Sequence, residues 1–140
     1  QRWPGKLAVK GIQTVADAKI AADRGVDAVI LSNHGGRQLD DAPAPIDLLP
    51  SVVDALGGGA EIILDGGIRR GSDMVKAVAL GAKACMIGRA YLYGLAVAGE
   101  EGVDFVLEHL AEGVERTLAL IGCHSVEALG PQYLERLERT

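Results

Sequence analysis

Short apolar runs alternate with helical segments along most of this sequence, and this alternation constrains the fold more than any other feature. The runs are rich in branched residues without alternating polar positions, which is typical of strands buried on both faces. We expect such strands at residues 7–9, 28–32, 61–64 and 84–87. Parallel neighbours require helix-length connections, so the pattern predicts a parallel sheet with right-handed crossovers.

A segment with helical signals follows each expected strand. Thr14, with Asp17 three residues later, resembles a capping box and opens a helix. Pro50 is tolerated in the first turn of the next helix, and Ser72 is the expected cap of the third. The expected helices cover residues 14–25, 50–56, 72–80, 90–98 and 104–121.

Two architectures can hold four such strand-helix units, an open doubly wound sheet and part of a (β/α)8 barrel. Polar clusters stand just past the C-terminal end of each expected strand, at Lys10, residues 32–37, residues 65–70 and Gly88 with Arg89. A barrel brings all such strand ends around one opening. Four units are half of eight, and 140 residues are about half of the ~250 in a complete barrel. We therefore expect an α/β fold, half of a TIM (β/α)8 barrel.

Charge and composition exclude several functional classes. The net charge of −5 and the pI of about 5.1 have the wrong sign for a nucleic-acid surface. No apolar run approaches the roughly 20 residues that cross a bilayer. Cys85 and Cys123 form no disulfide framework and show no metal-ligand spacing. We expect no bound metal and no nucleic-acid partner, and a reducing, cytoplasmic setting.

The stretch S-N-H-G-G-R-Q-L-D begins at the end of the second expected strand and carries the strongest chemical signal. His34 can accept a proton, and Arg37 presents a planar, permanently charged guanidinium. Gly35 and Gly36 leave room for a flat ligand to approach the backbone. A lone histidine or arginine would ordinarily be a loop or surface residue, but together they suit a small carboxylate substrate that loses a proton.

Two later loops resemble anion sites. D-G-G-I-R-R-G, at residues 65–71, combines glycines and arginines with the start of a helix, where N–H groups favour negative charge. I-G-R, at residues 87–89, repeats the arrangement one unit later. A plain glycine turn is the alternative, and the repetition favours a phosphate site.

These motifs, with V-K-G at residues 9–11, resemble the C-terminal half of the FMN-dependent 2-hydroxy acid oxidases and dehydrogenases. This family includes glycolate oxidase, L-lactate dehydrogenase and mandelate dehydrogenase. The resemblance implies the C-terminal half of a TIM barrel over residues 1–140, oxidation of an L-2-hydroxy acid such as lactate to the 2-keto acid, and FMN as cofactor. N-H-G-G-R-Q is specific to the family, whereas barrels resembling inosine monophosphate dehydrogenase share the D-G-G-I-R and I-G-R loops.

The resemblance also assigns roles to individual residues. His34 removes a proton from the carbon or hydroxyl of the substrate, and Arg37 binds its carboxylate. Lys10 lies beside the pyrimidine edge of the flavin, and Ser32 offers it a hydrogen bond. Asp65 holds the ribityl chain, while Arg69 and Arg89 meet the phosphate. The expected FMN-binding set is Lys10, Ser32, Asp65, Gly66, Gly67, Ile68, Arg69, Gly88 and Arg89.

The sequence starts with Gln1 rather than Met, so we interpret it as a piece of a longer protein. The N-terminal half of the family barrel would supply the substrate tyrosines and the aspartate that orients the histidine. We expect this chain to be inactive alone, and to self-associate or pair with that half. The electron acceptor stays open among oxygen, quinone and cytochrome, and the full-length protein could attach peripherally to the inner membrane. A flavin-free phosphate-binding barrel enzyme and a non-catalytic half-barrel are the alternatives.

Overall fold

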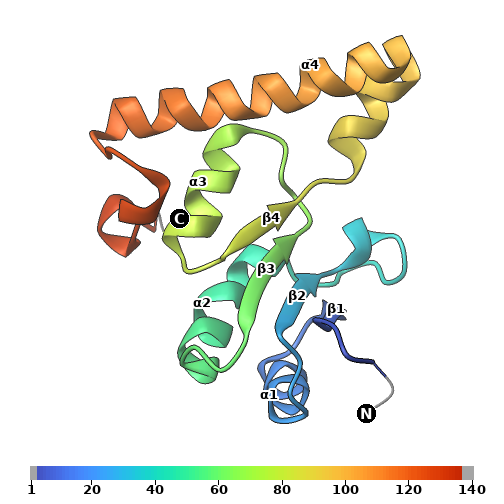
Figure 1. Ribbon diagram of the computed structural model, residues 1–140, viewed down its shortest axis with the longest axis vertical. Helices are drawn as coiled ribbons and strands as arrows, with labels where there is room; N and C mark the ends of the chain where they lie inside the picture. The colour runs from blue at the N-terminus through green and yellow to red at the C-terminus, as the bar shows by residue number, and fades with distance from the viewer. Residues whose placement is uncertain (1–2, 137–140) are drawn as a thin grey trace.

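A four-stranded parallel sheet forms the centre of the computed structural model, which describes residues 3–136 (Figure 1). The strands follow the order of the chain across the sheet, β1-β2-β3-β4. A doubly wound sheet would reverse this order at a switch point, whereas a barrel keeps it. The predicted parallel α/β fold is therefore confirmed, with the strand order of a barrel segment. The strands are β1 Ala8–Ile12, β2 Ala28–Ser32, β3 Glu61–Asp65 and β4 Ala84–Met86.

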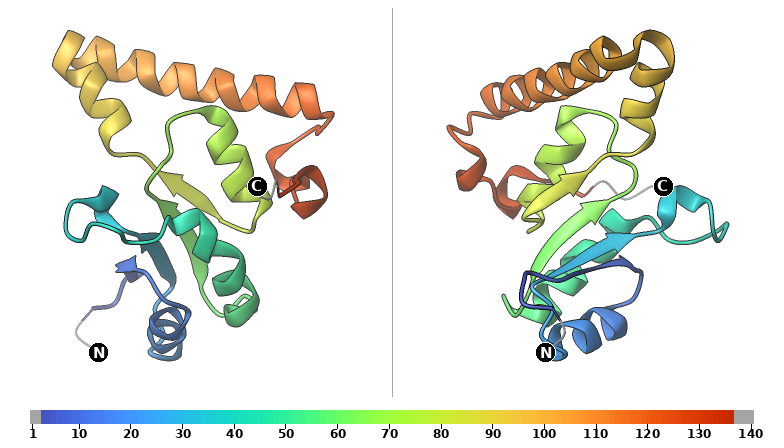
Figure 2. Two further views of the ribbon diagram at one scale, coloured as in Figure 1. Left: turned by 180° about the vertical axis from the view of Figure 1, so that it is seen from behind. Right: turned by 45° about the vertical axis from the view of Figure 1, so that its right-hand side comes forward.

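Helices connect the strands and follow one another along one face of the sheet (Figures 1 and 2). Helix α4 then crosses over α3 and carries the chain toward two short 3-10 turns near its end. The opposite face of the sheet carries no helix among residues 3–136 (Figure 2). The helices are α1 Val15–Asp23, α2 Pro45–Leu56, α3 Gly71–Ala79 and α4 Arg89–Ile121, with 3-10 turns at His34–Gly36, Val126–Ala128 and Pro131–Tyr133.

The core lies between the two central strands and the helices. All of β2 is buried, as its unbroken apolar sequence predicts. Leu31 and Leu64, from β2 and β3, have no exposed surface and pack with Leu49 and Val52 of α2. β1 and β4 form the two edges, and Ala84 and Met86 of β4 are exposed. The sheet is thus well packed at its centre and open at both sides.

The ends of several strands differ from the prediction by a few residues. Strand β1 does not end near Lys10 but continues to Ile12, because a bulge at Gly11 accommodates an extra residue opposite β2. Gly11 has a φ of 99°, a conformation that L side chains rarely adopt. Strand β3 extends one residue beyond its predicted end, to Asp65, and β4 ends one residue before its predicted end, at Met86.

Two predicted helix starts need correction. Helix α2 begins at Pro45 rather than Pro50, because proline suits a first helical position and Pro50 is accommodated inside the helix. The N-cap of α3 is Arg70, not Ser72. The carboxylate of Asp73 accepts the backbone N–H bonds of Arg69 and Arg70, at 3.0 Å and 2.9 Å, and takes over the capping role.

Helix α4 has two helical arms, as predicted, separated by non-helical conformations at Ala98 and Gly99. The second arm therefore starts close to residue 100 rather than at 104. Gly94 and Gly102 face each other across the bend so closely that a Cβ on Gly102 would lie 2.0 Å from the carbonyl oxygen of Gly94. Only glycine permits the two arms to approach in this way.

A second close approach joins α3 to α4, and it gives a stability prediction. A Cβ on Gly71 would lie 2.2 Å from the backbone of Gly113 and Val114. Gly71→Ala should lower the free energy of unfolding by about 1–3 kcal/mol, because the helices must separate. This loss outweighs the helix propensity that alanine adds, which is at most ~1 kcal/mol. Urea unfolding measures it. Ser72→Ala, one position along α3, is the control and should change little.

Candidate functional site

The C-terminal ends of the strands open into one cleft of about 1050 Å³. Its floor and rim come from Lys10 of β1 and from the segments at the ends of β2, β3 and β4, and α4 forms one wall. Among the predicted site residues, the cleft brings together side chains that lie up to 79 residues apart in the sequence, from Lys10 to Arg89. Of the predicted site residues, it is lined by Lys10, His34, Arg37, Asp65, Gly66, Gly67, Ile68, Arg69, Gly88 and Arg89.

Ser32 is the one predicted site residue that does not line the cleft. It has no exposed surface and lies beneath the floor. Its hydroxyl accepts hydrogen bonds from Lys10 Nζ, at 2.9 Å, and from the backbone N–H of His34, at 3.1 Å. It donates its own proton to Asp65 Oδ2. A hydrogen bond from Ser32 to a cofactor would have to replace one of these three.

Lys10 and Asp65 form an ion pair on the cleft floor, with 2.6 Å between Nζ and Oδ2. Burial alone would raise the pKa of the Asp65 carboxyl. Hydrogen bonds from Lys10 and Ser32, together with the positive charge of Lys10, outweigh it and hold this pKa below its usual value. Asp65 is therefore ionised at neutral pH, and the ammonium of Lys10 keeps a fixed position from which it can face a ligand.

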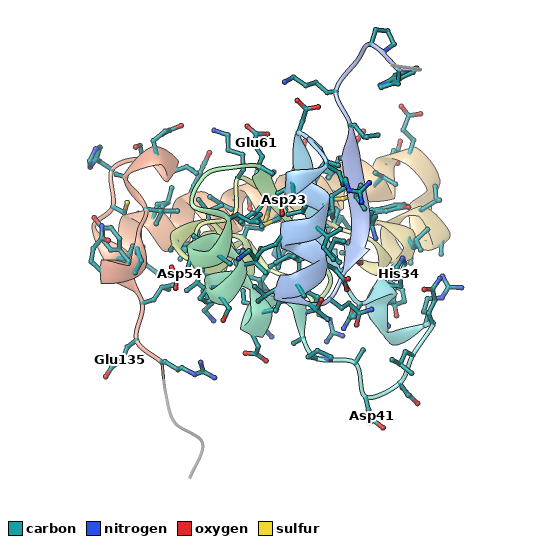
Figure 3. All side chains as sticks on the ribbon, turned by 90° about the horizontal axis from the view of Figure 1, so that it is seen from below. Asp23, His34, Asp41, Asp54, Glu61 and Glu135 are labelled. Carbon is teal, nitrogen blue, oxygen red and sulfur yellow. The ribbon has the colours of Figure 1, made fainter. Side chains whose placement is uncertain are left out.

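His34 lies in the short turn that follows β2, as Figure 3 shows from below. Asn33 starts the turn by accepting the N–H of Gly35 at 3.0 Å, and His34 itself takes a left-handed φ of 53°. The imidazole lies against Gly11. Its Nδ1 is buried and has no hydrogen-bond partner in the described part of the chain. A buried polar nitrogen without a partner is costly, so this atom is expected to meet one from outside residues 3–136.

Arg37 stands on the same rim as His34 but is exposed. Its guanidinium makes no hydrogen bond or ion pair within the described residues. Its planar donors are thus available to a carboxylate in the cleft. The predicted neighbourhood of a base and a guanidinium is present at this end of the cleft.

The other end of the cleft combines Arg89 with the N-terminus of α4. Arg89 Nη2 donates to the carbonyl oxygen of Gly35, at 3.1 Å, which links this end to the His34 turn. No side chain among the described residues caps α4, so its first N–H groups can bind an anion. At α3, by contrast, Asp73 already occupies the N–H groups of Arg69 and Arg70. The anion-binding features are therefore concentrated at α4 rather than shared equally between the two helices.

The remaining residues of the predicted D-G-G-I-R-R-G loop differ in their exposure and in whether they line the cleft. The side chain of Ile68 is 6% exposed and belongs to the hydrophobic core, although the residue also borders the cleft. Gly66 and Gly67 both have a positive φ, and Gly67 is exposed. Arg70 is exposed and does not line the cleft.

Sequence reasoning missed two parts of the site. Gly11 supports the imidazole of His34, and the only sequence signal for it is a glycine directly after the strand-end lysine. The wall from α4 includes Tyr93, Phe105 and His109. The ring of His109 stacks on that of Phe105, with centroids 6.2 Å apart.

Other chemistries find no support in residues 3–136. No group of three or more possible metal ligands is present among them. Both cysteines are free, and burial raises the pKa of the Cys85 thiol to about 11, so it is not a reactive thiolate. None of the described helices has the length and apolarity needed to span a bilayer.

Known proteins resemble this chain over nearly its whole length. The (S)-mandelate dehydrogenase of Pseudomonas putida is 53% identical over 95% of the chain, which covers 33% of that protein. The 2-hydroxyacid oxidase 1 of Mus musculus is 51% identical over 88% of the chain, again 33% of the relative. The pre-mycofactocin synthase of Mycobacterium tuberculosis is 55% identical over 92%, also 33% of its length. The chain thus spans about a third of these relatives.

A solved structure supports the same relationship. The crystal structure of the monotopic membrane protein (S)-mandelate dehydrogenase superposes with a TM-score of 0.91 and 53% identity, over 95% of this chain and 35% of that one. This agreement confirms the barrel type of α/β fold. The family model described as FMN-dependent dehydrogenase matches residues 1–136. With the motifs gathered around one cleft and the whole described chain matched, the chain belongs to the FMN-dependent dehydrogenase family.

Proposed function

We propose that the protein carrying this chain oxidises a small 2-hydroxy acid to the 2-keto acid with FMN as cofactor. One observation carries the proposal: the same cleft is lined by an imidazole and by a guanidinium and a helix N-terminus that have no side-chain partner within residues 3–136. Two relatives of high identity are named for 2-hydroxy acids or for mandelate, which is itself a 2-hydroxy acid. The family name supplies the cofactor.

The residues of the cleft fit FMN in charge and placement. Arg89, Arg69 and the N–H groups of α4 would hold the phosphate at one end. Lys10 would lie beside the flavin ring, with Asp65 near the ribityl chain. Gly66, Gly67 and Gly88 leave the backbone accessible, and Ile68 would contribute its backbone. When bound, FMN accepts the two electrons that leave the substrate.

The proposed substrate contacts come from the turn after β2. Arg37 would bind the carboxylate with two parallel hydrogen bonds, which fixes the orientation of the adjacent carbon. His34 would accept a proton from the substrate. Because Nδ1 is buried, Nε2 is the nitrogen available for this proton. The positive charge of Lys10 would stabilise negative charge that develops on the ring during oxidation.

We further propose that this chain is the C-terminal half of the barrel and works only with the remaining half. The exposed edges β1 and β4 and the unpartnered Nδ1 of His34 support this. A carboxylate from the other half would fix the ring tautomer, and its absence costs orders of magnitude in comparable triads. The 140-residue chain alone is therefore expected to turn over poorly or not at all, and to self-associate or pair with that half. The setting is proposed to be cytoplasmic, with peripheral membrane attachment allowed.

The test is to express the complete reading frame that encodes this chain and to examine the purified protein for bound FMN. Lactate, glycolate and mandelate are then added without oxygen, and bleaching of the flavin absorption is followed. We expect yellow protein and bleaching by at least one of these acids. Colourless protein that binds inorganic phosphate would favour the flavin-free barrel enzyme. Bound FMN without bleaching by any 2-hydroxy acid would contradict the proposed substrate class. Oxygen, a quinone or a cytochrome added afterwards identifies the electron acceptor.

A further inference from the structure

The backbone of β1 lies so close to the His34 imidazole that residue 11 has no room for a side chain. An ideal Cβ on Gly11 would lie 2.7 Å from His34 Cε1, 3.4 Å from Nε2 and 3.8 Å from Nδ1. The ring therefore occupies the space where residue 11 would place a side chain. This contact joins strand β1 to the turn after β2, at residues 11 and 34, which lie 23 positions apart in the sequence.

Hydrogen bonds do not hold the imidazole in place within residues 3–136. The backbone N–H of His34 is bonded to Ser32, but Nδ1 has no partner in the described chain. Packing against Gly11 is thus a contact that restricts the ring position here. The bulge in β1, between Lys10 and Ile12, places Gly11 at this point.

The neighbours of Gly11 are fixed, so an added methyl group would displace the ring rather than the strand. Lys10 is held by Ser32 and Asp65, and Ile12 pairs with Leu31 of β2. Carbon atoms in contact normally lie about 3.5–4.0 Å apart. Relief of a 2.7 Å contact therefore requires the ring to move by about 1 Å.

We propose that Gly11 is a positioning residue for His34, and that its missing side chain sets the place of the proton-accepting nitrogen. The catalytic consequence depends on the proposed function, whereas the placement of the ring does not. A misplacement of about 1 Å at a reacting group can cost about 100-fold in rate.

Gly11→Ala tests this, with Gly25→Ala as a matched control. Gly25 also has a positive φ, 81°, so alanine is strained there too, but in the described chain no atom beyond its two sequence neighbours lies within 4 Å of its Cβ position. In the protein from the complete reading frame, kcat for the best 2-hydroxy acid should fall about 10-fold to 100-fold in Gly11→Ala, with KM changed less than about threefold. Gly25→Ala should retain kcat. Equal kcat in the two variants would overturn the proposal.

A second measurement does not depend on activity. Diethyl pyrocarbonate modifies accessible imidazoles, and mass spectrometry quantifies each modified peptide. In the unliganded protein, the modification rate of His34 should rise in Gly11→Ala but not in Gly25→Ala, while exposed His124 reacts equally in all three. An unchanged His34 rate overturns the proposal. A different result would overturn only the proposed function: the unmutated protein oxidises no 2-hydroxy acid, but the modification rate of His34 still differs between Gly11→Ala and Gly25→Ala.

A double-mutant cycle covers the case in which Gly11→Ala unfolds the protein. His34→Ala removes the ring and frees the space that the new methyl group needs. The drop in Tm caused by Gly11→Ala should therefore be smaller in the His34→Ala background, and a protein that failed to fold should fold again. An equal drop in both backgrounds would show that backbone strain alone is responsible, and would contradict the contact on which the proposal depends.

Discussion

Replacement of His34 by glutamine is expected to abolish nearly all substrate oxidation while FMN stays bound. An amide is similar in size to the imidazole and can still form hydrogen bonds, but it cannot accept a proton at neutral pH. The loss of a positioned general base typically lowers kcat by about 10²–10⁴-fold. The measurement is the rate of flavin bleaching in a single turnover without oxygen, which reports the oxidation step and not the later transfer to an acceptor.

The control for this experiment is His124→Gln, because His124 is exposed and does not line the cleft. It should bleach at the rate of the unmutated protein. The FMN content of both variants, measured from the absorption of the purified proteins, should be unchanged. Equal bleaching by His34→Gln would remove His34 from the proposed reaction, even if the family assignment still holds.

Replacement of Arg37 by methionine is expected to lower kcat/KM by about 10²-fold or more. Methionine keeps much of the side-chain volume but loses the planar donors that would bind the substrate carboxylate. Loss of one partner in a hydrogen-bonded charge pair costs about 2–5 kcal/mol, where 1.4 kcal/mol is tenfold. Arg37→Lys keeps the charge without the two-point geometry, so an intermediate loss is expected. Steady-state kinetics at several substrate concentrations gives the values.

A substrate without a carboxylate provides a more specific control for the role of Arg37. Lactamide has the hydroxyl and carbon skeleton of lactate but no carboxylate. The unmutated protein should prefer lactate strongly, and this preference should nearly vanish in Arg37→Met. Arg116→Met, an exposed arginine of α4 outside the cleft, should leave the preference unchanged. A preference that survives in Arg37→Met would assign the carboxylate contact to another group.

The strand pattern and the general place of the site could be predicted from local signals. Strand β2 has the bounds expected from its unbroken apolar run, since a strand buried on both faces leaves no polar position. The polar clusters lie near or directly after the C-terminal ends of the strands in sequence. In a parallel sheet those ends share one edge, so their meeting in one cleft follows from strand direction alone.

Local signals were less successful at the ends of helices. The start of α2 at Pro45 was missed, although proline at a first helical position is a known signal, because the neighbouring Pro43 made the segment resemble a loop. Ser72 was chosen as a cap by residue type, but Asp73 satisfies the same N–H groups with a charged acceptor. Several residues that could start or cap a helix lie within a few positions of one another, and the three-dimensional path of the chain selects one of them.

The sequence by itself determined the parallel α/β arrangement, the family motifs and the set of residues that could surround a cofactor. Tertiary structure decided which of these side chains touch. It paired Lys10 with Asp65, 55 residues apart, placed Ser32 beneath both, and brought Gly11 against His34. The physical reason is that apolar periodicity and turn residues act over a few positions. Contacts between segments that are distant in the sequence depend on strand register and on a bulge at one glycine. Both follow only from packing of the whole sheet.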